Sequence, residues 1–219
     1  MFKVQRSCAI PESFLDKSLA QFLDELASDA PVPGGGSTAA LTGALAAALV
    51  SMVGHLTVGK KRYADVEAEV KALLDQSERL RKQLADLLEA DTQVYTSLSQ
   101  AYKLPRDTDE QKAARTAAIQ AALKEAEAVP MRIAEACAEV LDLCTPMAEK
   151  GNRLAVSDAG VAALLAEASL RSAALNVLIN LVYIEDEEFV SREQAKLDRL
   201  LEGKAQLKEQ VYELVIEKL

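Results

Sequence analysis

Two long stretches of this sequence carry almost no charge, and they limit the folds open to the chain more than any other feature. Residues 38–58 hold no ionisable side chain except His55, and residues 157–184 carry only Glu167 and Arg171 beyond their first turn. Segments this apolar and this long are either membrane spans or helices buried on all sides. The first stretch is largely Ala, Gly, Ser and Thr, and amphipathic segments follow it. We therefore predict two central helices of a helical core and no membrane span.

The composition of the chain is that of packed helices. Half of its 219 residues are hydrophobic, yet it has only four Phe, five Tyr and no Trp, with nine Gly and six Pro. Ala, Leu, Glu and Lys are abundant, and no segment alternates as a strand would. We predict an all-α, compact bundle in a single domain spanning residues 1–219. The net charge of −9 disfavours a nucleic-acid or anionic-membrane partner.

Turn-forming residues divide the chain into about six helices. Pro130 predicts a break or kink, and Pro146 and Gly151 mark the end of the stretch that follows it. We expect helices near residues 16–28, 37–59 and 63–102. The next begins after the turn at 104–109 and runs to about 128, and the stretch that follows Pro130 ends at 146–151. The last two helices are expected at 157–184 and 186–218.

Cysteine and histidine usage excludes several chemistries. Cys8, Cys137 and Cys144 have no metal-binding spacing, and we interpret them as reduced thiols that act as small core residues. His55 is the only histidine, so one chain cannot build a multi-histidine zinc site, and we expect this side chain to lie in the core. We predict no metal. The N-terminal residues do not resemble a secretory leader, which predicts a cytoplasmic protein.

The sharpest local motif is PVPGGGS at residues 31–37. Pro33, Gly34, Gly35 and Gly36 lead into the first apolar helix, with Ser37 as its expected N-cap. Glycines let a ligand approach the main chain, and free N–H groups at a helix start favour an anion. A tight connection between two helices explains the motif equally well, so both interpretations stay open at this point.

The densest cluster of positive charge follows the same helix. Lys60, Lys61 and Arg62 precede Tyr63 in an otherwise acidic chain. Cations are favourable at a helix C-terminus, which is sufficient to explain the cluster. It is also the best positive spot for an anionic substrate.

Asp91 is predicted on the apolar face of the long third helix. It follows Leu84 and Leu87 by seven and four residues and precedes Leu98 by seven. A carboxylate in such a place is costly unless it is partnered, and such groups are frequently functional. Arg171 or Lys60 could instead pair with it in a purely structural role.

The second apolar helix carries its own polar residues. Glu167 and Arg171 have the spacing of an ion pair within one helix. Asn176 and Asn180 lie one turn apart and could bind the edge of a heterocycle or bridge to another helix. Asp158, after Ser157, fits a helix cap and could also project into a cleft.

Taken in order, these motifs closely resemble the cyclodeaminase/cyclohydrolase family. This family contains the C-terminal domain of formiminotransferase-cyclodeaminase and the stand-alone bacterial methenyltetrahydrofolate cyclohydrolases. The resemblance runs from about Leu19 to the last helix, through PVPGGGSTAALTGALAAALVSMVGHLTVGKKRY, LPRDTDEQKAAR, KGNRLAVSDAGVAALLAEA and ALNVLINL. The chain carries Leu154 where the family pattern has a second asparagine after KGN.

The resemblance implies a helical homodimer that acts on the one-carbon unit at N5 and N10 of tetrahydrofolate. The folate would be the substrate, and no cofactor beyond this one-carbon carrier would be needed. We predict hydrolysis of 5,10-methenyltetrahydrofolate to 10-formyltetrahydrofolate, with cyclisation of formiminotetrahydrofolate and release of ammonia as the alternative. A binding module for another anionic heterocycle and a non-catalytic helical scaffold stay open as further alternatives.

The resemblance also suggests roles for individual residues. Asp91 is assigned first, and Asp158 second, as the acid–base group, which typically contributes about 10²–10⁴ in rate. Lys60 would orient a carboxylate or shift its pKa. The substrate would be bound by Pro33, Gly34, Gly35, Gly36, Ser37, Lys61, Tyr63, Asn152 and Asn180.

Overall fold

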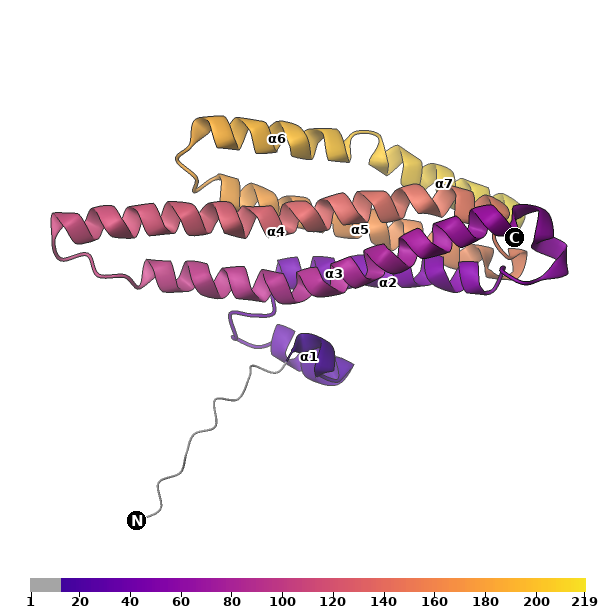
Figure 1. Cartoon of the computed structure of the whole chain (residues 1–219), viewed down its shortest axis with the longest axis horizontal. Coiled ribbons are helices and arrows are strands. Elements are labelled where there is room, and N and C mark those ends of the chain that lie inside the picture. Colours follow the sequence, from indigo (N-terminus) through magenta and orange to yellow (C-terminus); the bar gives the residue numbers. More distant parts are fainter. Residues whose placement is uncertain (1–12) are drawn as a thin grey trace, which may run out of the picture.

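The computed structural model describes residues 13–219, and every regular element in this part of the chain is a helix (Figure 1). The all-α prediction is therefore confirmed for these residues, whereas Cys8 lies outside them. The α-helices are α1 (Leu19–Leu26), α2 (Gly35–His55), α3 (Glu67–Tyr102), α4 (Asp109–Lys150), α5 (Val156–Leu181), α6 (Glu187–Leu201) and α7 (Lys204–Lys218). Short 3-10 turns occupy Phe14–Asp16, Lys61–Val66 and Arg153–Ala155.

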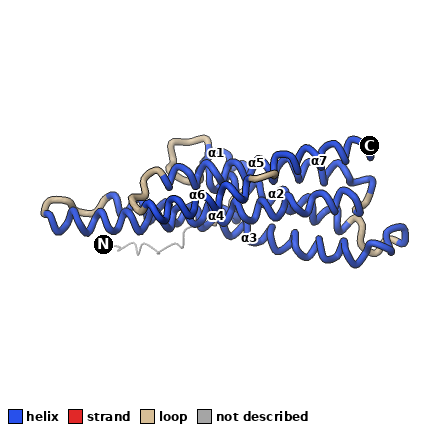
Figure 2. Tube along the Cα trace, turned by 90° about the horizontal axis from the view of Figure 1, so that it is seen from above, coloured by secondary structure: helices blue, strands red, loops and turns tan. Residues whose placement is uncertain are grey.

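Helices α2 to α5 form an elongated antiparallel bundle (Figures 1 and 2). Helix α2 packs on α3 and α5, and α4 packs on the same two helices from the other side. Helices α6 and α7 run along the outside of α4 and α5 (Figure 1). At one end, the C-terminal part of α3 and the N-terminal part of α4 project beyond α2 as a two-helix hairpin, which both views show.

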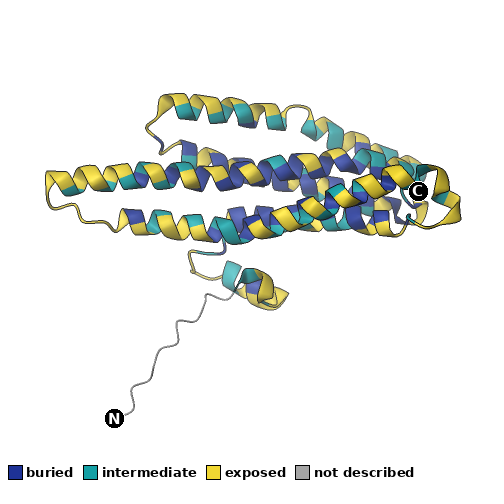
Figure 3. Ribbon diagram, in the orientation of Figure 1, coloured by how far each residue is buried: buried dark blue, intermediate teal, exposed yellow. Residues whose placement is uncertain are grey.

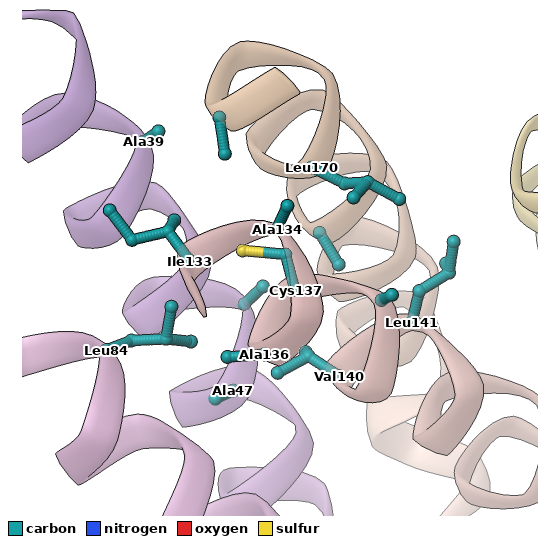
Figure 4. Close-up of a cluster of buried hydrophobic side chains, with 14 of the residues drawn as sticks. Ala39, Ala47, Leu84, Ile133, Ala134, Ala136, Cys137, Val140, Leu141 and Leu170 are labelled. Carbon is teal, nitrogen blue, oxygen red and sulfur yellow. The ribbon is translucent and has the colours of Figure 1, made fainter. Parts of the chain in front are cut away.

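The bundle core is built from small and branched side chains. Figure 4 shows Cys137 of α4 with Ala47, Leu84 and Leu170 around it, and all four are buried. Gly43 of α2 allows this close packing, since a Cβ there would lie 2.6 Å from Cys137 Sγ. Burial raises the pKa of the Cys137 thiol to about 12. Cys137 and Cys144 are free and buried, which confirms their interpretation as core residues.

Of the break or kink predicted at Pro130, the break does not occur, because α4 continues through it from Asp109 to Lys150. A proline has no N–H to donate to the carbonyl four residues earlier, here that of Ala126. Asn180 of α5 replaces this donor, since its Nδ2 lies 3.0 Å from Ala126 O. A side chain from a neighbouring helix thus donates the hydrogen bond that the Ala126 carbonyl would otherwise accept from a backbone N–H at position 130.

The segment 186–218, predicted as one helix, forms two helices, α6 and α7. Gly203 adopts a left-handed conformation, with φ of 72°, between α6 and α7. Residues with a Cβ rarely adopt this conformation, so the glycine allows the change of direction. The described residues consequently form seven α-helices where about six were predicted.

Two helices are long and apolar enough to cross a membrane by length and composition alone, namely α2 and the segment Arg153–Leu181 that contains α5. In the most apolar window of each, 56% and 44% of the residues are buried inside the bundle. Figure 3 shows the buried residues of the bundle on the faces where its helices meet. Packing of α2 and α5 against α3 and α4 accounts for much of their apolar sequence.

Candidate functional site

A cavity of about 330 Å³ opens where α2 begins. The glycine turn before α2 forms one wall, and α3 contributes Asp91 and Tyr95. Pro130 of α4 and Asn176 of α5 complete the lining, together with neighbouring residues. Four segments far apart in the sequence therefore meet around a partly polar hollow, which is the usual form of a small-molecule site.

The carboxyl of Asp91 is held against the first turn of α2. Ser37 Oγ donates a hydrogen bond of 2.7 Å to Asp91 Oδ2. Burial raises the pKa of Asp91, and the hydroxyl and backbone N–H of Ser37 partly oppose that rise by stabilising the carboxylate. The positive end of the α2 dipole acts in the same direction. The result is a partly desolvated carboxyl with a defined orientation.

Gly36 makes this approach possible. A Cβ at Gly36 would lie 2.1 Å from Asp91 Oδ1, far inside contact distance. Any larger residue would push the carboxyl away from the helix start. The predicted N-cap at Ser37 is wrong, because α2 begins at Gly35 with Gly34 as its cap. The Ser37 hydroxyl donates to Asp91 of another helix, and Gly36 allows the close approach to the main chain that was expected of the glycines.

The other predicted residues of the turn have different surroundings. Gly34, Gly35 and Gly36 line the cavity. Pro33 and Ser37 are buried behind this lining. The three glycines therefore face a hollow, as a ligand site at this turn requires, and their role in substrate binding stays a prediction.

Asn176 and Asn180 form the α5 wall of the cavity. Asn180 Nδ2 donates to Ala126 O and to Asn176 O, and Asn176 Nδ2 donates to Ser172 O. Both side chains are therefore held by backbone acceptors through their amide nitrogens. Within residues 13–219 neither side-chain oxygen accepts a hydrogen bond. Each is an acceptor that a donor on a bound molecule can use.

The remaining predicted site residues lie at the opposite end of the bundle. Lys60 and Lys61 follow the C-terminus of α2, about 30 Å from the glycine turn at 1.5 Å per residue. Tyr63 contacts this region through a 3.4 Å hydrogen bond to Asn152 Oδ1. Asp158 lies in the first turn of α5, about 30 Å before Asn176. A single chain does not bring these residues to Asp91.

Within this group at the far end of the bundle, Asn152 has a structural role. The backbone N–H of Asn152 donates to Thr57 Oγ1 at 2.8 Å, and its Nδ2 donates to Leu56 O at 2.9 Å. These bonds tie the turn before α5 to the end of α2. The predicted cap at Ser157 and Asp158 is wrong, since α5 begins at Val156 with no side-chain cap.

The structure contradicts the two expected partners of Asp91 and the expected burial of His55. Lys60 cannot pair with Asp91 or shift its pKa within one chain, because the two lie at opposite ends of α2. Arg171 is not its partner either, since the Arg171 guanidinium lies 3.6 Å from Glu167, as the helical spacing predicted. His55 is exposed at the last position of α2, so its interpretation as a core residue is wrong.

Comparison with known proteins now identifies the family. The formiminotransferase-cyclodeaminase family pattern matches residues 18–199, which is most of the chain. This chain belongs to that family. A protein named methenyltetrahydrofolate cyclohydrolase, from Methylorubrum extorquens, is 48% identical over 204 residues, covering 93% of this chain and 98% of its own length. The formimidoyltransferase-cyclodeaminase of Rattus norvegicus is 36% identical over 191 residues, or 87% of this chain and 35% of the rat protein.

A solved structure of the formiminotransferase-cyclodeaminase family has the same fold. The crystal structure of formiminotetrahydrofolate cyclodeaminase from Thermotoga maritima superposes with a TM-score of 0.76 at 33% sequence identity. The match covers 93% of this chain and 96% of the other. The all-helical fold that the family resemblance implies is therefore confirmed.

Sequence reasoning missed part of the cavity wall of this family member. Tyr95, Ile179 and Pro130 line the cavity but were not assigned to the site. Tyr95 could have been found, since it follows Asp91 by four residues and therefore shares its helix face. Pro130 gave no such signal, because its place in the wall depends on α4 continuing through it.

Proposed function

We propose that this chain hydrolyses the methenyl bridge of 5,10-methenyltetrahydrofolate to give 10-formyltetrahydrofolate. The observation that carries the proposal is the oriented, partly desolvated carboxyl of Asp91 on a cavity, in a chain 48% identical to a named cyclohydrolase. The reaction requires a base for water and an acid for the departing nitrogen. A carboxyl with a raised pKa is suited to both tasks.

The chemistry follows from the charge of the substrate. The methenyl carbon lies between N5 and N10 in a cationic amidinium, so it is already electrophilic. Asp91 accepts a proton as water forms its bond to this carbon, which gives a tetrahedral intermediate. The bond from carbon to N5 then breaks, and Asp91 returns a proton to N5. Ionisation of the remaining hydroxyl yields the formyl group on N10 and releases one proton to solvent.

The surroundings of Asp91 support this role. In this proposal its carboxylate lies beside the cationic methenyl carbon, which attracts the substrate and places the base next to the attacking water. The free side-chain oxygens of Asn176 and Asn180 are acceptors for the N–H groups of a pterin edge. No step of this sequence requires a cofactor beyond the folate that carries the one-carbon unit.

A second candidate is the cyclodeaminase reaction, which the similarity to the Thermotoga maritima protein favours. There N5 carries a formimino group, N10 attacks its carbon, and ammonia departs. The same carboxyl would take the proton from N10 and protonate the leaving nitrogen. Both reactions share a tetrahedral carbon with nitrogen substituents, so one site geometry serves either.

The deciding experiment follows the methenyltetrahydrofolate absorbance band. The enzyme is added to methenyltetrahydrofolate and, separately, to formiminotetrahydrofolate, with ammonia assayed in parallel. Loss of the band faster than the uncatalysed rate supports the cyclohydrolase. Growth of the band with ammonia release supports the cyclodeaminase. No change in either, with no folate binding by calorimetry, would leave the scaffold alternative.

We also propose that the chain acts as a homodimer. Helices α2 and α5 expose large apolar side chains on the bundle surface, and patches of this kind mark protein interfaces. These residues are Leu45, Met52, Leu56, Leu164, Leu175, Ile179 and Val182. Light scattering after gel filtration tests the proposal, and a charged substitution at Leu175 should give monomers.

An antiparallel dimer would explain why the predicted site residues are separated. It would carry Lys60, Asn152 and Asp158 of one subunit towards the cavity of the other. Mixing two inactive variants, Asp91→Asn and Lys60→Ala, tests this arrangement. Recovery of about one quarter of the wild-type activity in the mixture supports a shared site, whereas no recovery contradicts it.

A further inference from the structure

A second hollow adjoins the candidate site on the outer part of α3. It has a volume of about 240 Å³ and is lined by Tyr95, Leu98, Ser99, Tyr102 and Lys103. Tyr95 and Leu98 also line the cavity that holds Asp91, so the two hollows adjoin at these side chains. The groove lies on the part of α3 that projects beyond α2 (Figure 1).

We propose that this groove binds the aminobenzoylglutamate arm of the substrate, with the aromatic ring between Tyr95 and Tyr102 and the glutamate at Lys103. The inference rests on the proposed folate function and adds the place where the arm lies. It also gives a direction to the bound substrate, with the pterin towards α5 and the arm along α3.

The spacing of the residues fits such an arm. Along a helix that rises 1.5 Å per residue, Tyr95 is about 6 Å from Asp91 and Tyr102 is about 16 Å from it. A benzoyl ring followed by a glutamate extends over a distance of this order from the one-carbon unit. Tyr95 and Tyr102 are seven residues apart, so both side chains lie on one face of the helix.

The chemistry of the groove fits an aromatic ring. Tyr95 and Tyr102 are each 46% exposed, in a chain with only nine aromatic residues in all. Two exposed tyrosines that flank Leu98 offer apolar faces on which a ring can stack. Nothing within α3 requires tyrosines at these positions, since much of their surface contributes little to the core.

The charge of the groove fits the glutamate. Lys103 is exposed at the C-terminus of α3 and forms no ion pair within residues 13–219. Arg115 of α4 lies near it, with its guanidinium 3.1 Å from Tyr102 O and 5.9 Å from the Tyr102 ring centroid. These two cations give an acidic protein a local positive end beside the aromatic pair, which attracts carboxylates.

Charge reversal at Lys103 tests the proposal. Lys103→Glu should raise the KM for methenyltetrahydrofolate about three- to tenfold with kcat nearly unchanged, because an exposed ion pair becomes a repulsion. Added salt should raise the wild-type KM and lower the KM of Lys103→Glu, because it screens the attraction in the first and the repulsion in the second. Lys82→Glu is the matched control, since it makes the same change at an exposed position of α3 about 30 Å from Lys103.

A truncated substrate locates the effect. The N-methylamide of the methenyl derivative of tetrahydropteroate has neither the glutamate nor a free benzoate carboxylate, so Lys103→Glu should not change its KM. Tyr102→Ala should raise the KM for both substrates by about threefold, because the ring is present in each. An equal effect of Lys103→Glu on both substrates, or no effect on either, would overturn the proposed position of the glutamate.

The same experiments separate this inference from the proposed function. If the wild type turns over neither folate, the proposed function fails, and calorimetry with p-aminobenzoylglutamate tests the groove alone. Binding that is lost in Lys103→Glu and kept in Lys82→Glu supports the groove. Turnover that is normal in the wild type and unchanged in Lys103→Glu and Tyr102→Ala overturns the groove and leaves the function intact.

Discussion

Ser37 and Asp91 are 54 residues apart in sequence, and their side chains are joined by a 2.7 Å hydrogen bond across α2 and α3. The hydroxyl donates, so it stabilises the ionised carboxylate and opposes the pKa rise that burial causes. The balance of these two effects sets the pH at which Asp91 can act as a base.

Ser37→Ala should therefore raise the pKa of Asp91. The acid limb of the pH–rate profile depends on ionised Asp91, so it should move to higher pH. Rates measured across the acid range in buffers of constant ionic strength would detect the shift. Ser97→Ala, at an exposed position of α3, should leave the profile in place. A limb that moves to lower pH in Ser37→Ala would contradict the assignment.

Asp91→Asn should reduce kcat by about 10²–10⁴ and leave the protein folded. Because the pKa of Asp91 is raised, its proton binds more tightly in the folded protein, and stability falls as pH rises through that pKa. Asparagine cannot ionise, so the melting temperature at neutral pH should be unchanged or slightly higher. Asp86→Asn, on the exposed side of α3, should match the wild type in both measurements. A large loss of stability in Asp91→Asn would indicate a structural role instead.

Gly36→Ala should displace the Asp91 carboxyl, because the new Cβ would lie 2.1 Å from Oδ1. We expect kcat to fall by at least tenfold, since catalysis depends on the position of this group. Gly34→Ala adds the same methyl group two residues earlier, where nothing lies within 4 Å, and should lower kcat far less. Steady-state kinetics with circular dichroism as a folding control would decide, and equal losses in the two variants would rule out the steric explanation.

Asn180→Ala should destabilise the protein by about 1–3 kcal/mol, because it leaves the buried Ala126 carbonyl without a donor. Pro130→Ala restores a backbone N–H for the same carbonyl. In the double variant, the loss at Asn180 should therefore be smaller than in the single variant. Urea unfolding of all four proteins gives the coupling energy, and strictly additive effects would contradict the compensation.

Glu127 makes stability depend on pH. It is a residue of α4 with 2% of its surface exposed, and its Oε1 has no hydrogen-bond partner among residues 13–219. Burial, followed by repulsion from Glu193, raises its pKa to about 7. Because the folded protein holds this proton more tightly, stability should fall by at most about 3 kcal/mol as pH rises from about 4.5 through 7.

Glu127→Gln mimics the protonated form and should flatten this dependence. Melting temperatures between pH 5 and 8 would reveal it, with the variant more stable than the wild type at pH 8. Glu125→Gln changes an exposed neighbour on the same helix and should keep the wild-type slope. If the melting temperature of Glu127→Gln depended on pH as steeply as that of the wild type, the titrating group would be a residue other than Glu127.

The architecture was largely predictable because it follows from local pattern. The uncharged stretches became α2 and α5, and the periodicity of α3 placed Asp91 towards the core and beside Tyr95. These features depend on the 3.6-residue repeat of a single helix, which can be counted along the chain. The glycine turn was readable as a place where a neighbour could approach the main chain, but only the structure shows that Gly36 meets Asp91 there.

The assembly of the site was not predictable in the same way. Lys60 and Asn152 were grouped with Asp91 from motif order, yet they lie at the other end of α2. Pro130 predicted a break or kink, yet α4 continues through it, and Asn180 of another helix donates to the carbonyl that the proline leaves without a backbone donor. Sequence by itself determined which faces of the helices are apolar, because side-chain burial repeats with the helical turn. Only the tertiary structure decided which polar groups meet, because that depends on the direction and offset of packed helices.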